Sequence, residues 1–381
     1  MAVEKWSWER VRALRLERHG LAAPLGGGPA AVVRAMASTH AQVMSAAELA
    51  IAIRLDGATR QDVRAALWND HTLVKTFGLR GTVHLLPTED LPMWLGALAG
   101  LPQAPNNGLP EEARLTPGQT DEIIDAIGAI LADAELTVDE LTEALGDAVG
   151  SWAVEKVMPA WQEMWPRWRQ ITHLAAHRGA LCFGHNKGRK VTYTNPHRWL
   201  PGFTPLPPEE AHPALLRAYL WAYGPSTPAR FAHWLNAPVR WAREVFEATE
   251  LRQVEAEGVP AYVAADDTAE PAGPPAGLRL LPYFDGYAYR VGNQPPELLY
   301  PGRAAERVLP YNFQILIIDG VVAGLWHQKR SGRRLAITVE PLRPLTPAHR
   351  RELDEQAERV GRILEARPEV AIGEVTAGSH P

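Results

Sequence analysis

The sequence predicts a mainly helical α+β protein made of tandem winged-helix units, each a helix-turn-helix followed by a β-hairpin, with a β-rich C-terminal segment. Three observations favour this fold class. Helices followed by a hairpin occur twice in the first half of the chain, a third helix-turn-helix pattern follows a proline-rich linker, and strand-forming runs dominate the last third. Repeated units of this kind without a catalytic α/β sheet are typical of proteins that bind duplex nucleic acid.

The length of 381 residues exceeds the size at which one hydrophobic core keeps growing, so several domains are expected. We divide the chain into a first winged-helix unit at 1–110 and a second at 111–205. A third helix-turn-helix unit follows at 206–275. The β-rich segment with a hairpin and a terminal helix occupies 276–381.

In the first unit, apolar residues recur at helical spacing over 6–19, 30–37, 46–55 and 60–69. Ser45 and Glu48 have the spacing of a capping box at the start of the third helix. The β-rich runs 73–79 and 82–86 are joined around Arg80 and Gly81, which predicts a hairpin.

The second unit repeats this order. Helices are predicted over 118–132, 138–145 and 171–178, and a hairpin joins strands near 180–183 and 190–193. Thr137 and Glu140 form a capping-box pattern before the second of these helices. A group of tryptophans has spacings that suit helical core packing better than base stacking: Trp152, Trp161, Trp165 and Trp168.

The third unit has predicted helices over 215–223, 227–235 and 239–248. Pro228 and Pro238 fall near helix starts, and Asn236 falls in the turn between two helices, which favours a helix-turn-helix. In the β-rich segment, Asp319-Gly320 between apolar runs predicts a two-residue hairpin turn.

Composition excludes several classes of protein. Cys182 is the single cysteine, so neither an intramolecular disulfide nor a thiolate metal cluster can form. The chain contains no glycine-rich phosphate loop, nucleophile elbow or HExxH motif, and we expect no cofactor and no metal. Apolar runs are far shorter than the roughly 20 residues that span a bilayer, and the N-terminus lacks a secretory signal, so a cytoplasmic protein is expected.

The net charge of −5 argues mildly against nucleic-acid binding, but the charges are unevenly distributed. Acidic residues dominate 111–143, whereas basic residues dominate 162–200 and 329–351. Either basic stretch alone is also what solvated loops would show. We take as candidate DNA contacts the basic and hairpin residues Arg80, His84, Lys187, Arg189, Lys190, Lys329, Arg330 and Arg333.

His40 and Gln42 lie just before the predicted helix 46–55. If this short run is extended, residues i and i+2 face the same side, and the two side chains project together. They are then able to hold one water molecule or contact one sugar. The alternative is that both are polar loop residues that bond nearby backbone.

Five segments, taken together, resemble the AlkZ-like and AlkX-like winged-helix alkylpurine DNA glycosylases over nearly the whole chain: THAQVMSAAELAIAIRL, LVKTFGLRGTVHLLPTEDL, AYLWAYGPSTPARFAHW, LLPYFDGYAYR and GLWHQKRSGRRLAITVEPL. The family's catalytic Gln-apolar-Gln or Gln-apolar-Asp motif falls on His40-Ala41-Gln42. The second position matches directly, whereas His40 takes the first only by substitution. His-apolar-Gln variants occur among AlkZ-like relatives from producers of DNA-alkylating antibiotics, so the resemblance implies a substrate subclass.

The resemblance implies a monofunctional glycosylase that hydrolyses the N-glycosidic bond of alkylated purines in double-stranded DNA, chiefly N7-alkylguanine, and acts as a monomer. Alkylation at N7 already weakens this bond, so the enzyme mainly needs a placed water. A neutral His40 imidazole can accept the proton of that water, while Gln42 can only position it. No lysine lies near the motif to form a Schiff base with the sugar, which agrees with a monofunctional enzyme.

Other assignments carry alternatives. Asp285 either steers a cationic adduct as a substrate-binding residue or bonds turn amides, and His84 either touches phosphates or bonds within the fold. The hairpin 315–326 either probes DNA, as the resemblance implies, or is a core strand pair. Two functions rival the enzyme: a DNA-binding regulator without catalysis, and a resistance protein that sequesters drug or adducted DNA. No dimerisation heptad supports the regulator.

Overall fold

The computed structural model describes residues 3–102, 108–160, 163–288, 296–310 and 312–376. The chain folds into two compact units. One combines Met1–Asp70 with Leu216–Pro381, and the other is the continuous segment His71–Leu215. Both units mix helices with small sheets, as the α+β class requires. The division into winged-helix units at the four predicted segments stays a prediction.

The discontinuous unit begins with β1 (Glu4–Trp6) and α1 (Trp8–Arg18). Ser7 caps α1 by accepting a hydrogen bond from the Arg10 amide, and Gly20 at φ 66° follows its end. β1 pairs in parallel with β10 (Leu251–Ala256), which pairs in antiparallel with β11 (Val259–Ala264). One face of this sheet and α1 share a hydrophobic core that includes Trp6, Leu14 and Val263.

Next in this unit come α2 (Gly28–Ala35), β2 (Thr39–His40), α3 (Met44–Ala52) and α4 (Arg60–Trp68). The predicted capping box of Ser45 and Glu48 is wrong. The N-cap of α3 is Val43, and Glu48 is only 2% exposed. Its carboxylate instead accepts two hydrogen bonds from the Arg64 guanidinium of α4, at 2.7 and 3.1 Å, so it ties two helices together.

The predicted helix-turn-helix is α11 (Pro228–Leu235) and α12 (Val239–Glu247), preceded by α10 (Pro208–Tyr223), within which the unit boundary falls. Thr227 caps α11 with Pro228 as its first residue, and Asn236 ends the helix in the left-handed conformation at φ 58°. The predicted roles of Pro228 and Asn236 are therefore confirmed.

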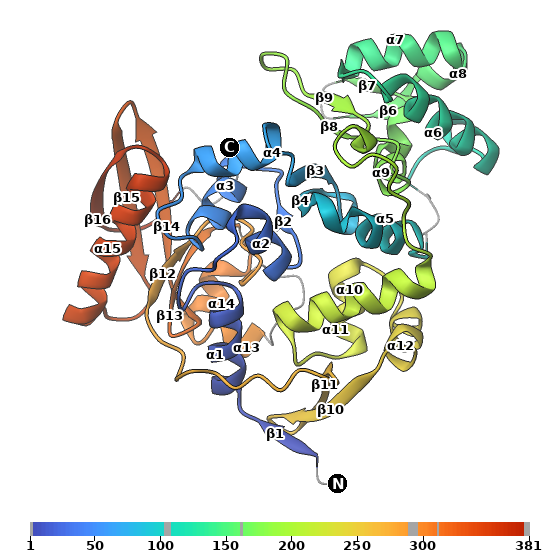
Figure 1. Cartoon of the computed structure of the whole chain (residues 1–381). Coiled ribbons are helices and arrows are strands. Elements are labelled where there is room, and N and C mark those ends of the chain that lie inside the picture. The colour runs from blue at the N-terminus through green and yellow to red at the C-terminus, as the bar shows by residue number, and fades with distance from the viewer. Residues whose placement is uncertain (1–2, 103–107, 161–162, 289–295, 311, 377–381) are drawn as a thin grey trace. The chain divides into compact units, whose positions relative to one another are not determined.

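The β-rich segment forms a sheet in the order β12 (Leu278–Leu281), β13 (Gln314–Ile318), β14 (Val321–Ser331), β15 (Arg334–Pro341) and β16 (Arg367–Ile372). Asp319 and Gly320 both have positive φ and join β13 to β14, which confirms the predicted turn. The long helix α15 (Pro347–Ile363) packs against this sheet, and the short helices α13 (Pro296–Leu299) and α14 (Arg303–Val308) precede β13 (Figure 1).

The continuous unit contains the hairpin β3 (Leu73–Phe77) and β4 (Val83–Pro87), then α5 (Leu91–Ala99), α6 (Pro117–Leu131), α7 (Val138–Ala148) and α9 (Thr172–His177). A second sheet has the order β5 (Leu136–Thr137), β9 (Thr192–Thr194), β8 (Cys182–Phe183). The capping box of Thr137 and Glu140 is confirmed, with both reciprocal hydrogen bonds formed.

The predicted helical arrangement of the tryptophans is wrong. Their segment contains α8 (Ser151–Val154), the hairpin β6 (Lys156–Pro159) and β7 (Met164–Pro166), and a 3₁₀ turn at Arg167–Ile171. Trp168 is completely buried in the unit's core, as expected, whereas Trp152 and Trp165 are half-buried. Trp161 lies outside the described residues. No helix among the described residues is long and apolar enough to cross a membrane.

Candidate active site

The segment that carries His40 and Gln42 is not helical, but only its start is a strand, because Gln42 lies in the bend before α3. His40 ends β2, and the exposure of side chains alternates: His40 is half-buried, Ala41 is completely buried and Gln42 is exposed. This alternation is compatible with His40 and Gln42 projecting to the same side of the backbone, as in an extended run. The catalytic assignment of the two residues stays a prediction.

The backbone that leads into His40 adopts a costly conformation. Ala37 and Ser38 have φ values of 50° and 102°, a region that residues with a Cβ rarely adopt. The Ser38 amide donates to the Val33 carbonyl, and the Tyr223 hydroxyl donates to the Met36 carbonyl at 2.8 Å. Strain of about 1–3 kcal/mol per residue persists only where surrounding contacts impose it, and it concentrates at functional sites. These contacts fix the direction in which β2 leaves α2.

Phe284, from a distant part of the sequence, packs against His40. The two ring centroids are 4.6 Å apart and the ring planes are inclined by 46°. Phe284 is itself in the left-handed region, at φ 59°. The imidazole therefore lies between a strained connector and a strained loop.

Asp285 is held in place by Arg54. The Arg54 guanidinium donates to both carboxylate oxygens at 2.7 and 2.8 Å, and the Tyr287 amide donates to the same carboxylate at 3.1 Å. Both side chains of the ion pair are 0% exposed. Such a carboxylate is closed to a substrate, so the geometry favours the structural alternative for Asp285.

His19 extends this buried group. Its Nε2 lies 2.9 Å from the Ala222 carbonyl oxygen, and its ring contacts those of Tyr223 and Tyr287. Burial, followed by the nearby Arg54 charge, lowers the pKa of His19 to about 3. His19 is therefore neutral at pH 7 and donates from Nε2 to the carbonyl.

The candidate DNA contacts of the β3–β4 hairpin differ in exposure. Arg80 lies exposed in the 3₁₀ turn Leu79–Gly81 at φ 58°. His84 is 5% exposed, and its Nδ1 lies 3.0 Å from the Thr82 carbonyl oxygen. A side chain so buried is poorly placed to reach a phosphate, which favours the structural alternative for His84.

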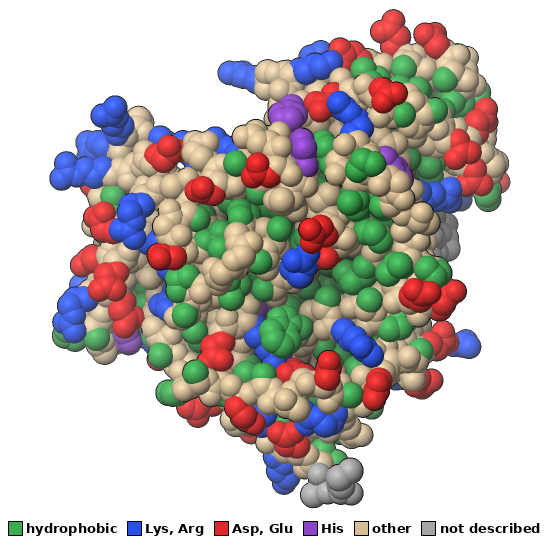
Figure 2. All heavy atoms as spheres, viewed as in Figure 1, with side chains coloured by type: hydrophobic (Ala, Val, Ile, Leu, Met, Phe, Trp, Pro, Cys, Tyr) green, Lys and Arg blue, Asp and Glu red, His purple; other side chains and the backbone are tan. Residues whose placement is uncertain are grey.

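Lys187, Arg189 and Lys190 lie together in the exposed loop between β8 and β9. Two of these charges are paired: Lys187 Nζ lies 2.9 Å from Glu140, and Lys190 Nζ lies 2.7 Å from Asp139. Acidic side chains gather over α6 and α7 in the space-filling view (Figure 2). Of the three cations, only the guanidinium of Arg189 has no ion pair within the described part of the loop's unit.

Lys329, Arg330 and Arg333 lie exposed at the tip of the β14–β15 hairpin, where Lys and Arg side chains gather at the upper left of Figure 2. Arg330 donates to the Leu364 carbonyl at 2.9 Å and to that of Gly332. The neighbouring hairpin 315–326 is different: β13 and residues 322–326 are buried in the sheet. The core alternative therefore applies to that hairpin.

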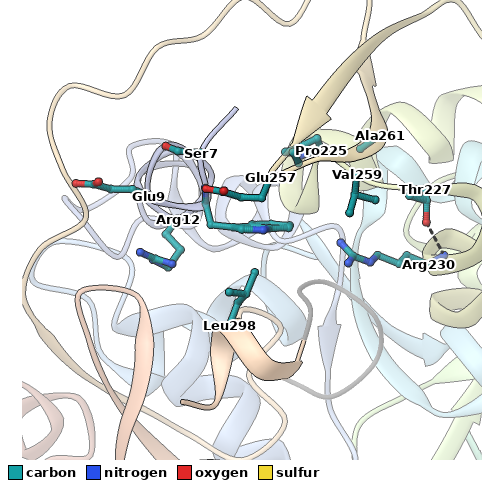
Figure 3. Close-up of a pocket in the computed structure, with 12 residues that line it drawn as sticks. Ser7, Glu9, Arg12, Pro225, Thr227, Arg230, Glu257, Val259, Ala261 and Leu298 are labelled. Carbon is teal, nitrogen blue, oxygen red and sulfur yellow. Dashed lines mark hydrogen bonds between the residues drawn. The ribbon is translucent and has the colours of Figure 1, made fainter. Parts of the chain in front are cut away.

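A separate cavity of about 640 Å³ lies within the discontinuous unit. Arg12 and Arg230 reach it from opposite sides of Leu298, and Glu257 and Thr227 also line it (Figure 3). Sequence reasoning did not find this cavity, and none of the predicted site residues lines it. Among the described residues, no group of three or more His, Cys, Asp or Glu side chains is placed to hold a metal ion.

Comparison with known proteins agrees with the resemblance in the sequence. Residues 33–363 match the family model described as DNA glycosylase AlkZ-like. An interstrand DNA cross-link repair glycosylase of Streptomyces sahachiroi is 31% identical over 335 residues, which cover 84% of this chain and 88% of that protein. The structure of Streptomyces sahachiroi DNA glycosylase AlkZ has a TM-score of 0.82 and 30% identity, and the alignment covers 97% of this chain and 100% of that one.

These matches and the fold define the chain as a DNA glycosylase, an enzyme that breaks the bond between a base and its deoxyribose in DNA. It belongs to the AlkZ-like DNA glycosylase family. The rival interpretation as a regulator without enzymatic activity is therefore wrong. The regulator interpretation assumes that His40 and Gln42 have no catalytic role, which their spacing in the sequence alone does not exclude.

Sequence reasoning missed Arg54 and Phe284. Arg54 follows the apolar helix α3, where an arginine suggests a solvated helix end, and only the fold brings Asp285 to it. In the segment YFDGY the carboxylate is the evident candidate for a ligand contact, whereas nothing local indicates that the neighbouring ring contacts His40.

Proposed function

We propose that this glycosylase hydrolyses the N-glycosidic bond of N7-alkylguanine in duplex DNA, including bulky natural-product adducts and crosslinks. The observation that carries the proposal is the geometry of the motif: the half-buried His40 and the exposed Gln42 flank the completely buried Ala41. The Streptomyces sahachiroi relative is named for interstrand cross-link repair, which supports an adduct larger than a methyl group.

In the proposed reaction, the bond between C1′ and N9 breaks and its electron pair goes to the cationic alkylguanine, which leaves as a neutral base. A water molecule attacks C1′, and its proton passes to the His40 imidazole. Gln42 holds this water or the adjacent deoxyribose, because an amide has no useful basicity near pH 7. The product is an abasic site in an uncut strand. A base placed in this way contributes about 10²–10⁴-fold to the rate.

DNA contact is proposed through tandem winged-helix units in a monomer. Arg80, Arg189, Lys329 and Arg333 are the exposed cations that support this part of the proposal. Lys187, Lys190 and Arg330 contribute less, because the lysines have acidic partners and Arg330 donates to backbone carbonyls. Phosphate contacts position the duplex and do not select the base.

The test is release of 7-methylguanine and of bulky guanine adducts from duplex DNA under single-turnover conditions. Wild type is compared with His40→Ala and Gln42→Ala, and Ser45→Ala serves as an exposed neighbouring control. We expect His40→Ala to reduce base release by about 10²–10⁴-fold without a change in DNA affinity. A wild-type rate in His40→Ala would refute the assignment, and DNA binding by the wild-type protein without release of any of these bases would refute N7-alkylguanine as the substrate.

A further inference from the structure

The ring of Phe284 is placed to control the orientation of the His40 imidazole. Its centroid is 4.6 Å from that of His40, which is van der Waals contact for inclined rings. Neither residue is fully buried, so the ring contact lies at the edge of the core. Phe284 is thus a side chain from the C-terminal segment that contacts the motif.

The conformation of Phe284 is imposed by its neighbour. A phenylalanine at φ 59° is strained, and the conformation persists only if the adjoining residues are fixed. The next residue, Asp285, is fixed by three hydrogen bonds, two from Arg54 and one from the Tyr287 amide. Arg54 is anchored in turn, because it donates to the Ala50 carbonyl of α3 at 2.6 Å.

α3 is also the helix that follows the motif. The segments that carry His40 and Phe284 are therefore both attached to α3. The motif enters α3 through Val43, and the Phe284 loop is attached to α3 through Arg54 and Ala50. Such an arrangement keeps two side chains from distant parts of the sequence in a constant relation.

We propose that Phe284 is a positioning residue for His40, whose ring holds the imidazole in the orientation that accepts the proton of the attacking water. This inference rests on the proposed function, because it assumes that His40 is the base. It explains why a strained aromatic residue stands where glycine would be free of strain.

The experiment combines rates with a double-mutant cycle. Single-turnover release of 7-methylguanine is measured for wild type, Phe284→Ala, Phe284→Tyr, His40→Ala and the double variant His40→Ala/Phe284→Ala. We expect Phe284→Ala to slow release by about 10- to 100-fold, the effect of a small misplacement of a catalytic group. Phe284→Tyr keeps the ring and restores the rate, and DNA affinity stays constant throughout.

The double variant separates positioning from general damage. If Phe284 acts through His40, its removal costs nothing further once His40 is alanine. Equal losses in both backgrounds would overturn the inference while leaving the proposed function intact. A wild-type rate in His40→Ala would instead refute the proposed function itself.

A spectroscopic measurement decides the inference without catalysis. The imidazole C–H signals of His40, identified by their absence from His40→Ala, carry a ring-current shift from Phe284. We expect this shift to disappear in Phe284→Ala and to persist in Tyr262→Ala, which removes another half-buried ring that packs on Phe246 instead. Unchanged His40 signals in Phe284→Ala would overturn the inference even if every variant were too slow to assay.

Discussion

Arg54 and Asp285, which are 231 positions apart in the sequence, form a completely buried ion pair. Two hydrogen bonds join the guanidinium to the carboxylate. The pair connects the α3 segment, which follows the His40 motif, to the loop that carries Phe284. Removal of charge from one partner leaves the other as a buried charge without compensation.

We expect Asp285→Asn to lower the free energy of unfolding by about 3–5 kcal/mol, because the Arg54 charge keeps its desolvation cost and loses its attraction. Urea unfolding of the wild-type protein and the variant measures the difference. Glu244→Ala is the control, since its pair with Arg240 is exposed and should contribute less than about 1 kcal/mol. A loss of similar size in both variants would contradict this account of the buried pair.

His19 makes stability depend on pH. Its pKa is about 3 in the folded protein, chiefly through burial, whereas the unfolded chain takes up a proton near the ordinary value of 6.5. Between these values the unfolded state binds more protons, so stability falls as the pH falls, by up to about 1.4 kcal/mol per pH unit. His19→Gln should reduce this loss when unfolding is measured between pH 7 and 4.

The control for that measurement is His233→Gln, which replaces an exposed histidine on α11. Its pH profile should follow that of the wild-type protein. A His19→Gln profile that also follows the wild type would show that the buried imidazole does not cause the acid-side loss.

The contribution of the α7 capping box to stability depends on pH, because Glu140 must be ionised. The Thr137 backbone amide, and then the Lys187 side chain, lower the Glu140 pKa from 4.5 to about 2. A lowered carboxylate pKa stabilises the fold above the ordinary value, and the contribution is lost as the pH falls through about 2. The stability difference between wild type and Glu140→Gln should therefore shrink from pH 6 to pH 2.

The capping box of α6 provides the comparison, because Thr116 and Gln119 carry no titratable group. The effect of Gln119→Ala on stability should be the same at every pH in that range. A pH-dependent effect of Gln119→Ala would mean that the acid transition reports another part of the unit.

Neighbouring arginines at the β14–β15 tip test the DNA surface. Arg333→Ala should reduce the slope of log K against log salt concentration by about 1, because one phosphate contact is lost. Arg334→Ala should change it less, since the Arg334 guanidinium already binds Glu369 at 2.5 Å. Filter-binding or anisotropy titrations at several salt concentrations measure both slopes. Equal slopes for wild type and Arg333→Ala would contradict a phosphate contact at Arg333.

Most elements could be predicted from sequence because their signals are local. The Thr137 cap, the αL residue Asn236 and the Asp319-Gly320 turn depend on neighbours within a few positions, and all three formed as predicted. Glu48 has an equally good local pattern but binds Arg64 instead, a long-range contact that spacing does not reveal. The site divides in the same way: the motif is local, whereas Phe284 reaches His40 only through the fold.

The discontinuity of the first unit has a consequence for synthesis on the ribosome. His40 and Arg54 emerge early, but Phe284 and Asp285 emerge only after the whole segment His71–Leu215 has been made. Until then the Arg54 guanidinium has no Asp285 carboxylate to pair with, and the His40 imidazole lacks its contact with the Phe284 ring. A chain that terminates before residue 284 therefore carries the His40 motif without the ring and the ion pair that surround it in the complete fold.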